Sequence, residues 1–157
     1  RVEAGLPLFG HELEGPAEIS LGEAGYSFAV KPCAARFIGR NPYLQKNSPP
    51  RRKLVRLAGR GSKAVRPGHL ILDEQNRKVG TVTSFAFVDP AKNFVALACV
   101  EAGFPASPGD VVRGLRAAVH EDGRAPEERK IVRLDVLSRF PDPAEREARQ
   151  ERYQRVG

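Results

Sequence analysis

The sequence predicts a mainly β protein with some α structure, of the α+β class, built on a six-stranded antiparallel barrel or sandwich and ending in a helix. Six short apolar or β-branched runs recur at spacings of about ten residues between positions 53 and 137, each bounded by turn residues. The 15 glycines and 13 prolines also suit short strands and many turns better than a helix bundle. At 157 residues the chain holds one domain, or one small domain with part of another.

The six strands are expected at residues 53–58, 69–72, 78–88, 93–100, 111–119 and 130–137. The third of these runs is the most strongly β-branched. The fourth is almost continuously apolar, which predicts a mostly buried strand with Cys99 as a core thiol. Phe85 and Phe87 share one face of the third strand by period two, and we expect both to face the core.

The region before residue 50 is organised differently. Residues 1–13 begin without Met and enter an apolar segment at once, so we expect a packed segment that lacks chain upstream or a partner chain. Residues 23–31 alternate around Tyr26 and predict a strand. Asn41 followed by Pro42 predicts the start of a short helix, with Asn as its cap. The polar segment that ends in two prolines at 49–50 is the best candidate for a domain boundary.

A charged helix is expected at residues 144–155, after a cap formed by Asp142 and Pro143. Glu145 and Arg149 stand four residues apart, where opposite charges stabilise a helix. Because the segment has few apolar residues, we expect a solvated helix that docks lightly.

The net charge of +7 and pI near 9.8 favour anionic partners, although surplus basic residues also serve simply to solvate a surface. Residues 51–66 carry seven basic residues and no acid, which suits RNA or DNA binding on a small β-barrel. The interleaved aromatic residues of a stacking surface are missing there, and this argues against nucleic acid. A non-enzymatic basic module that binds RNA or an acidic partner is the alternative function.

Residue spacing gives little support for metal or nucleophilic chemistry. The three histidines and two cysteines stand apart, with no C-x-x-C pair and no metal-ligand spacing, so we expect no metal site and no disulfide framework. The absence of a disulfide framework fits a reducing compartment. Ser84 lies within a predicted strand and is read as a structural hydroxyl. The loop at residues 59–63 lacks phosphate-loop spacing, and no apolar run is long enough to span a bilayer.

Three blocks of sequence resemble the aminomethyltransferase (glycine cleavage T-protein) family: R-V-E-A-G-L-P-L-F-G-H-E-L from residue 1, E-A-G-Y-S-F-A-V-K from residue 23 with F-I-G-R from residue 37, and K-V-G-T-V-T-S from residue 78. The return strand N-F-V-A-L-A-C-V and the turn S-P-G-D follow in the family's order. The resemblance covers roughly residues 1–137. Departures are Arg36 for an acid, Phe28 for a common Trp and Phe85 for a usual Gly.

This resemblance implies a tetrahydrofolate-dependent one-carbon transferase, in which folate attacks an aminomethyl group on a lipoyl carrier protein to give methylenetetrahydrofolate and ammonia. It implies that residues 1–48 are the tail of a folate-binding α/β domain. It further implies that residues 52–140 form a Greek-key or jelly-roll-like β-barrel. From their own composition, residues 141–157 are expected to form a charged helical tail. Cytoplasm, or the mitochondrial matrix in a eukaryote, is the expected location, and no membrane contact is expected.

Arg1 is the one cofactor-binding residue that the resemblance implies, since it matches the family's folate-binding arginine in R-x-E-A-G. Its permanent charge and planar fork of donors suit carboxylate or carbonyl oxygens; the alternative is a surface pair of Arg1 with Glu3. The family's catalytic aspartate and pterin-binding glutamate have no counterpart here, so no catalytic residue is assigned and we expect the chain alone to be inactive. Folate-dependent demethylases and the folate domains of related dehydrogenases share much of the pattern and stay open.

Overall fold

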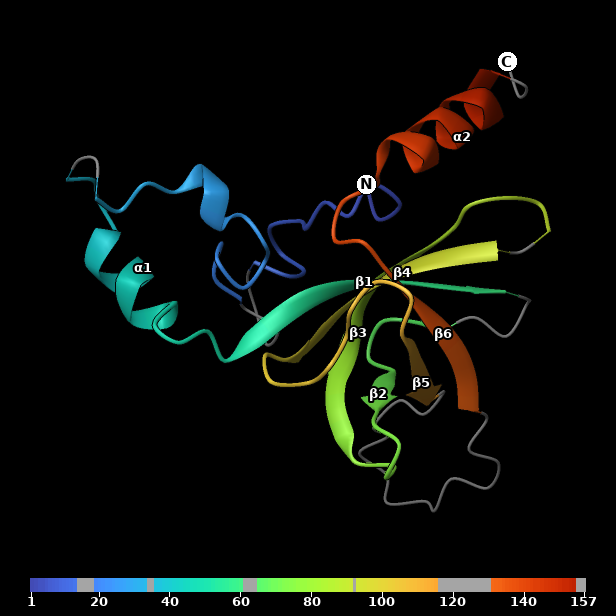
Figure 1. Cartoon of the computed structure of the whole chain (residues 1–157), viewed down its shortest axis with the longest axis horizontal. Helices are drawn as coiled ribbons and strands as arrows, with labels where there is room; N and C mark the ends of the chain where they lie inside the picture. The colour runs from blue at the N-terminus through green and yellow to red at the C-terminus, as the bar shows by residue number, and fades with distance from the viewer. Residues whose placement is uncertain (14–18, 34–35, 61–64, 92, 116–130, 155–157) are drawn as a thin grey trace.

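The computed structural model describes residues 1–13, 19–33, 36–60, 65–91, 93–115 and 131–154. Within these residues the chain forms six strands and two α-helices, together with a short 3-10 helix (Figure 1). In chain order the elements are η2 (Ser27–Ala29), α1 (Arg40–Lys46), β1 (Arg52–Arg60), β2 (Leu70–Leu72), β3 (Lys78–Phe87), β4 (Asn93–Glu101), β5 (Val111–Leu115), β6 (Ile131–Leu137) and α2 (Pro143–Gln154).

The strands close into an antiparallel barrel in the order β1-β4-β3-β2-β5-β6, with β6 pairing back onto β1. β1 lies beside β4 along nine residues, whereas β2, β3 and β4 are joined as successive hairpins. β1 thus pairs with β4, the last strand of this hairpin series, and such a pairing is the Greek-key arrangement. The predicted mainly β fold with a six-stranded barrel is therefore confirmed.

Alternate residues of the strands fill the barrel interior. On β4, Phe94, Ala96, Ala98 and Val100 are all buried in one apolar cluster. The cluster takes its other members from the remaining strands and from one loop residue: Val55, Leu57, Val65, Ile71, Val79, Val82, Val112, Leu134 and Val136. This alternation follows the period of two by which a strand presents its side chains.

The intervening residues of β1 and β4 are also buried, because the N-terminal segment covers them. Val95, Leu97 and Cys99 of β4 join Leu54 of β1 in a second cluster on the outer face of the barrel. Val2, Ile19 and Ala24 pack against this face. Burial on both sides explains why residues 93–100 read as one apolar run. Cys99 is buried as predicted, and burial raises the pKa of its thiol.

The predicted strand at residues 23–31 is wrong. Residues 21–25 form turns and residues 27–29 form η2. The Ser20 hydroxyl accepts the Glu23 N–H, and the Glu23 carboxylate accepts the Ser20 N–H at 2.9 Å. This reciprocal pair is a capping box, which holds a turn. Phe28 is 72% exposed, so the loose alternation produces no buried face.

Smaller differences concern element ends and one core residue. α1 begins at Arg40 with Gly39 as its N-cap at φ +88°, rather than with Asn41 as the cap. β5 ends at Leu115 among the described residues, and positions 116–119 and 130 lie outside them. Phe85 packs against the interior cluster, but Phe87 is 47% exposed and its prediction as a core residue is wrong.

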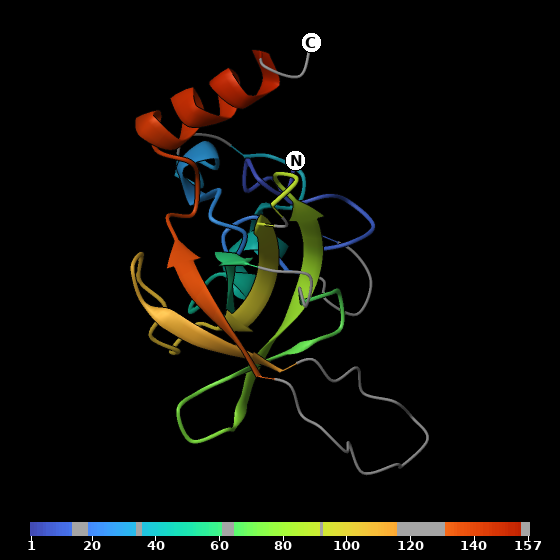
Figure 2. The same cartoon turned by 90° about the vertical axis from the view of Figure 1, so that its right-hand side faces the viewer.

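α2 lies beyond one end of the barrel and α1 lies to one side (Figures 1 and 2). Asp142 caps α2 as predicted, since its carboxylate accepts the Glu145 N–H at 2.8 Å and Pro143 is the first helical residue. Glu145 also forms an ion pair with Arg56, which is buried on the outer face of β1. This contact ties the base of the charged helix to the barrel.

Gly59 on β1 offers a test of the interior packing. A Cβ atom at this position would lie 2.3 Å from the Cζ atom of Phe94, whose ring is buried. We expect Gly59→Ala to lower the free energy of unfolding by about 1–3 kcal/mol, because overpacking forces the core to shift. Urea unfolding measures this. Gly103→Ala is the control, since a Cβ there meets nothing within 4 Å; equal stabilities for the two variants would contradict the packing shown.

Candidate functional site

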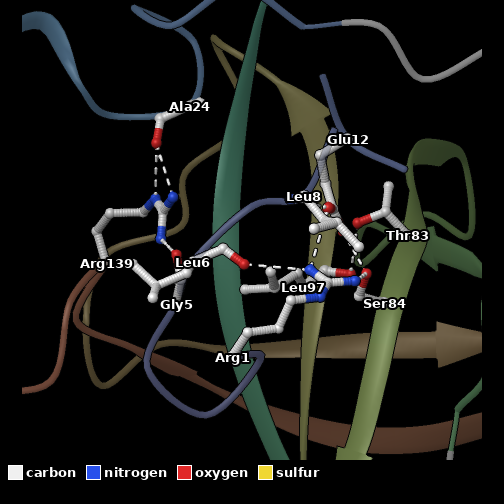
Figure 3. A network of polar contacts seen from close by, with 10 residues as sticks. All are labelled: Arg1, Gly5, Leu6, Leu8, Glu12, Ala24, Thr83, Ser84, Leu97 and Arg139. Atoms are coloured by element: carbon white, nitrogen blue, oxygen red, sulfur yellow. Dashed lines mark hydrogen bonds and ion pairs between the residues drawn. The ribbon is translucent and has the colours of Figure 1, made fainter. Parts of the chain in front are cut away.

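Arg1 lies at the centre of a polar network between the N-terminal segment and β3 (Figure 3). Its Nη1 donates to the Leu6 carbonyl oxygen at 3.1 Å and to Glu12 Oε2 at 3.3 Å. Its Nη2 donates to Ser84 Oγ at 2.7 Å. Ser84 in turn donates to Glu12 Oε1, and Glu12 Oε2 also accepts the Leu8 N–H at 2.9 Å. Three groups, from the N-terminal segment and β3, therefore contact one guanidinium.

Glu12 is fully buried, and a buried carboxylate is costly unless its oxygens are paired. Burial by itself raises the pKa of Glu12. Hydrogen bonds from Ser84 and the Leu8 N–H, together with the nearby Thr83 hydroxyl and the charge of Arg1, outweigh burial and hold the pKa below its ordinary value. Glu12 is therefore an ionised acceptor at neutral pH.

A bulge in β3 brings Ser84 to this network. Val82 pairs with Ala98 of β4 and faces the interior, but the next pairing is Ser84 with Leu97. The extra residue is Thr83, whose hydroxyl donates to the Leu97 carbonyl oxygen at 3.1 Å. Without it Ser84 would share the interior face with Val82. The sequence places Ser84 within a strand correctly, but nothing in T-V-T-S predicts the bulge.

Arg139 holds the same N-terminal segment a short distance away (Figure 3). Its guanidinium donates to the Ala24 carbonyl oxygen from two nitrogens, at 2.7 and 3.0 Å, and to the Gly5 carbonyl oxygen. It also lies 4.5 Å from the ring centroid of Phe140. Burial is the main cause that lowers the pKa of Arg139. Gly5 has φ +71° and no room for a Cβ beside Arg139, so glycine is required there.

A groove of about 660 Å³ adjoins the network. It lies between the turn at residues 10–11 and strands β3 and β4, and Thr83 lines both the groove and the network. His11, Arg52 and Lys78 contribute basic groups to its wall, and Glu101 contributes an acid. A hollow of this size suits a small molecule.

The structure therefore places the predicted ligand Arg1 with two partners that sequence reasoning missed, Glu12 and Ser84. Contacts with Leu6, Glu12 and Ser84 hold the Arg1 guanidinium. Arg56, counted in the basic stretch 51–66, is buried against Glu145 and is not a surface charge. Positions 61–64 of that stretch lie outside the described residues.

Among the described residues, no group of three or more His, Cys, Asp or Glu side chains is arranged to hold a metal ion. In the same part of the chain, no helix has both the length and the apolar character needed to cross a membrane.

Acid unfolding tests the role of Glu12. A carboxyl whose pKa is lowered on folding stabilises the protein fully above its ordinary pKa of 4.5, and this contribution is lost as the pH falls through the lower folded value. We expect Glu12→Gln to lower stability at neutral pH by about 1–3 kcal/mol and to weaken the pH dependence below about pH 4.5. Urea unfolding at several pH values measures both effects. The control is Glu74→Gln at an exposed turn residue; an acid limb in Glu12→Gln as steep as that of the parent chain would contradict the role.

Comparison with known proteins identifies relatives of this chain, although no family model matches it. It is 37% identical over 105 residues to an aminomethyltransferase of Caldanaerobacter subterraneus subsp. tengcongensis, covering 66% of this chain and 27% of that protein. It is 36% identical over 121 residues to an aminomethyltransferase of Moorella thermoacetica, covering 76% of this chain and 32% of that protein.

A solved structure shows the same fold. It is the glycine cleavage system aminomethyltransferase T of Bartonella henselae, with a TM-score of 0.67, 24% identity, and coverage of 88% of this chain and 36% of that one. The chain thus spans about a quarter to a third of the length of the curated relatives that it matches. Over about two thirds of its own length, this chain is homologous to part of the aminomethyltransferase (glycine cleavage T-protein) family, as its sequence blocks predicted.

Proposed function

We propose that this chain is part of a tetrahydrofolate-dependent aminomethyltransferase of the glycine cleavage type. In the proposed reaction, an aminomethyl group carried by a lipoyl carrier protein is transferred to tetrahydrofolate, giving methylenetetrahydrofolate and ammonia. The relatives named aminomethyltransferase support the reaction class. The observation that carries the role of this chain is the network that fixes Arg1 while leaving part of its guanidinium open.

The donors of Arg1 fit a folate-class ligand. A guanidinium has five N–H donors, and three are used toward Leu6, Glu12 and Ser84. Among the residues that the structure describes, the Nε–H group has no partner, and Nη2 has a second hydrogen. The side chain is 27% exposed, so part of it is open to solvent. Folate offers carbonyl and carboxylate oxygens, which are the acceptors that such a fork prefers.

Arg1 would bind and orient the ligand rather than transfer a proton, because an arginine side chain stays protonated in proteins. Glu12 is also a poor proton-transfer group at neutral pH, since its pKa is lowered and both carboxylate oxygens are occupied. When bound, tetrahydrofolate supplies the nucleophilic nitrogen for one-carbon transfer. The proposed contribution of this chain is therefore ligand orientation, with acid–base groups supplied by protein that lies outside it.

The proposal includes a division of labour along the chain. Residues 1–48 would be the tail of a folate-binding domain, residues 52–140 the barrel, and residues 141–157 a charged tail. The proposed partners are a lipoyl carrier protein of the glycine cleavage type and the remaining part of the transferase, whether covalently joined or separate. The cytoplasm, or the mitochondrial matrix in a eukaryote, is the proposed location.

Ligand titration tests the role of Arg1. We expect 5-formyltetrahydrofolate, added to the ¹⁵N-labelled 157-residue chain, to shift the amide signals of Gly5, Leu6, Leu8 and Ser84 with saturation in the millimolar range. Arg1→Gln should weaken this binding about tenfold or more, because a charge-assisted hydrogen bond is lost. The control is Arg60→Gln, at an exposed arginine at the end of β1. No saturable shift in the parent chain would overturn the proposed ligand role.

Ammonia release tests the proposed division of labour. We expect the isolated chain, mixed with an aminomethylated lipoyl carrier protein and tetrahydrofolate, to release ammonia no faster than the same mixture without the chain. The reason is that the described network around Arg1 holds no group suited to proton transfer at the reacting nitrogen. Turnover at the rate of a complete aminomethyltransferase, used as the positive control, would contradict this expectation.

A further inference from the structure

The Ser84 hydroxyl has two partners, and their chemistry fixes which way its proton points. A guanidinium can only donate, so Ser84 Oγ accepts from Arg1 Nη2 at 2.7 Å. An ionised carboxylate can only accept, so Ser84 donates to Glu12 Oε1. Ser84 is 3% exposed, which leaves water little access to replace either contact. The hydroxyl is thus a fixed bridge between a cation and an anion.

This bridge is the tighter of the two side-chain contacts that hold the guanidinium. The direct contact of Arg1 with Glu12 is 3.3 Å, longer than a charge-assisted hydrogen bond usually is, whereas the contact with Ser84 is 2.7 Å. The two contacts use different nitrogens, Nη1 and Nη2. Because the planar guanidinium is held at both Nη1 and Nη2, it cannot rotate about its Nε–Cζ bond. The direction of the Nε–H bond is therefore fixed.

The bulge in β3 gives Ser84 this place. The pairing with β4 passes from Val82 to Ser84, and the neighbours of Ser84 on the outer face include the apolar side chain of Leu97. An apolar residue would therefore suit this buried position for packing alone. The Ser84 hydroxyl instead forms hydrogen bonds with both Arg1 and Glu12.

We propose that Ser84 is a positioning residue, which orients the Arg1 guanidinium so that its open edge faces a folate-class ligand. The inference rests on the proposed function for the identity of the ligand, but not for the effect of Ser84 on Arg1. Ser84 itself does not touch the ligand. Its influence passes through Nη2 of Arg1 and through Glu12, which holds Nη1.

The test combines binding with a direct measure of Arg1 order. We expect Ser84→Ala to weaken binding of 5-formyltetrahydrofolate about tenfold in the 157-residue chain, because one contact to the guanidinium is lost. In the Arg1→Gln background, Ser84→Ala should have no further effect on affinity. The Nε–H signal of Arg1, followed by ¹⁵N relaxation without ligand, should report a more mobile side chain in Ser84→Ala than in the parent chain.

Glu23→Gln is the matched control. Glu23 is a buried carboxylate that accepts backbone N–H groups of Ser20, Arg51 and Arg52, and it does not contact Arg1. We expect this variant to lose stability while keeping the ligand affinity and the Arg1 relaxation of the parent chain. A merely structural role for Ser84 predicts the same pattern for Ser84→Ala.

The outcomes separate the two proposals. If the parent chain binds the folate and Arg1→Gln weakens binding, but Ser84→Ala binds as the parent does with unchanged Arg1 relaxation, the positioning role is overturned and the function stands. An equal loss of affinity on Ser84→Ala in both backgrounds would also overturn positioning. If the parent chain binds no folate, the function fails, and the Arg1 relaxation of Ser84→Ala still decides whether Ser84 orders the guanidinium.

Discussion

The apolar outer face of β4 is the constraint on which the rest of the structure depends. Val95, Leu97 and Cys99 point away from the barrel interior, yet they are almost as buried as the residues that point into it. Leaving such a face in water would forfeit the hydrophobic free energy that makes the strand stable. The N-terminal segment provides the cover, with Val2 and Ile19 packed directly onto the strand pair. The barrel and this segment therefore form one packed body.

The N-terminal segment covers this face with turns and loops. Its backbone N–H and C=O groups therefore lack the partners that a neighbouring strand would supply. Charged side chains do this work. Glu23 accepts backbone N–H groups, while Arg56 and Arg139 donate to carbonyl oxygens of Glu3, Gly5 and Ala24. Buried charges of both signs are thereby paired with dipoles of the segment they hold. Arg1 differs from the buried Arg56, because its side chain is 27% exposed. That difference separates a ligand-binding candidate from arginines that serve the fold.

The sequence predicted the strongly patterned elements and failed where local side-chain bonds decide the backbone. β3 and β4 were predictable because β-branched content and an unbroken apolar run are properties of the residues themselves. The strand predicted at residues 23–31 does not form, because the Ser20–Glu23 capping box outweighs the weak alternation of apolar residues. Arg1 came from a family resemblance. Its partner Ser84 lies 83 residues away and reaches it only through a bulge, which period-two reasoning cannot place.

The location of the Arg1 network bears on how a chain that matches only part of its relatives can contribute to their chemistry. The contacts that hold the Arg1 guanidinium come from the segment at residues 6–12 and from β3. Proton transfer at neutral pH requires groups whose pKa lies near neutrality. The network contains a permanently charged guanidinium and a carboxylate with a lowered pKa, and neither meets that condition. Under the proposed function, the Arg1 network would therefore serve ligand orientation and not proton transfer.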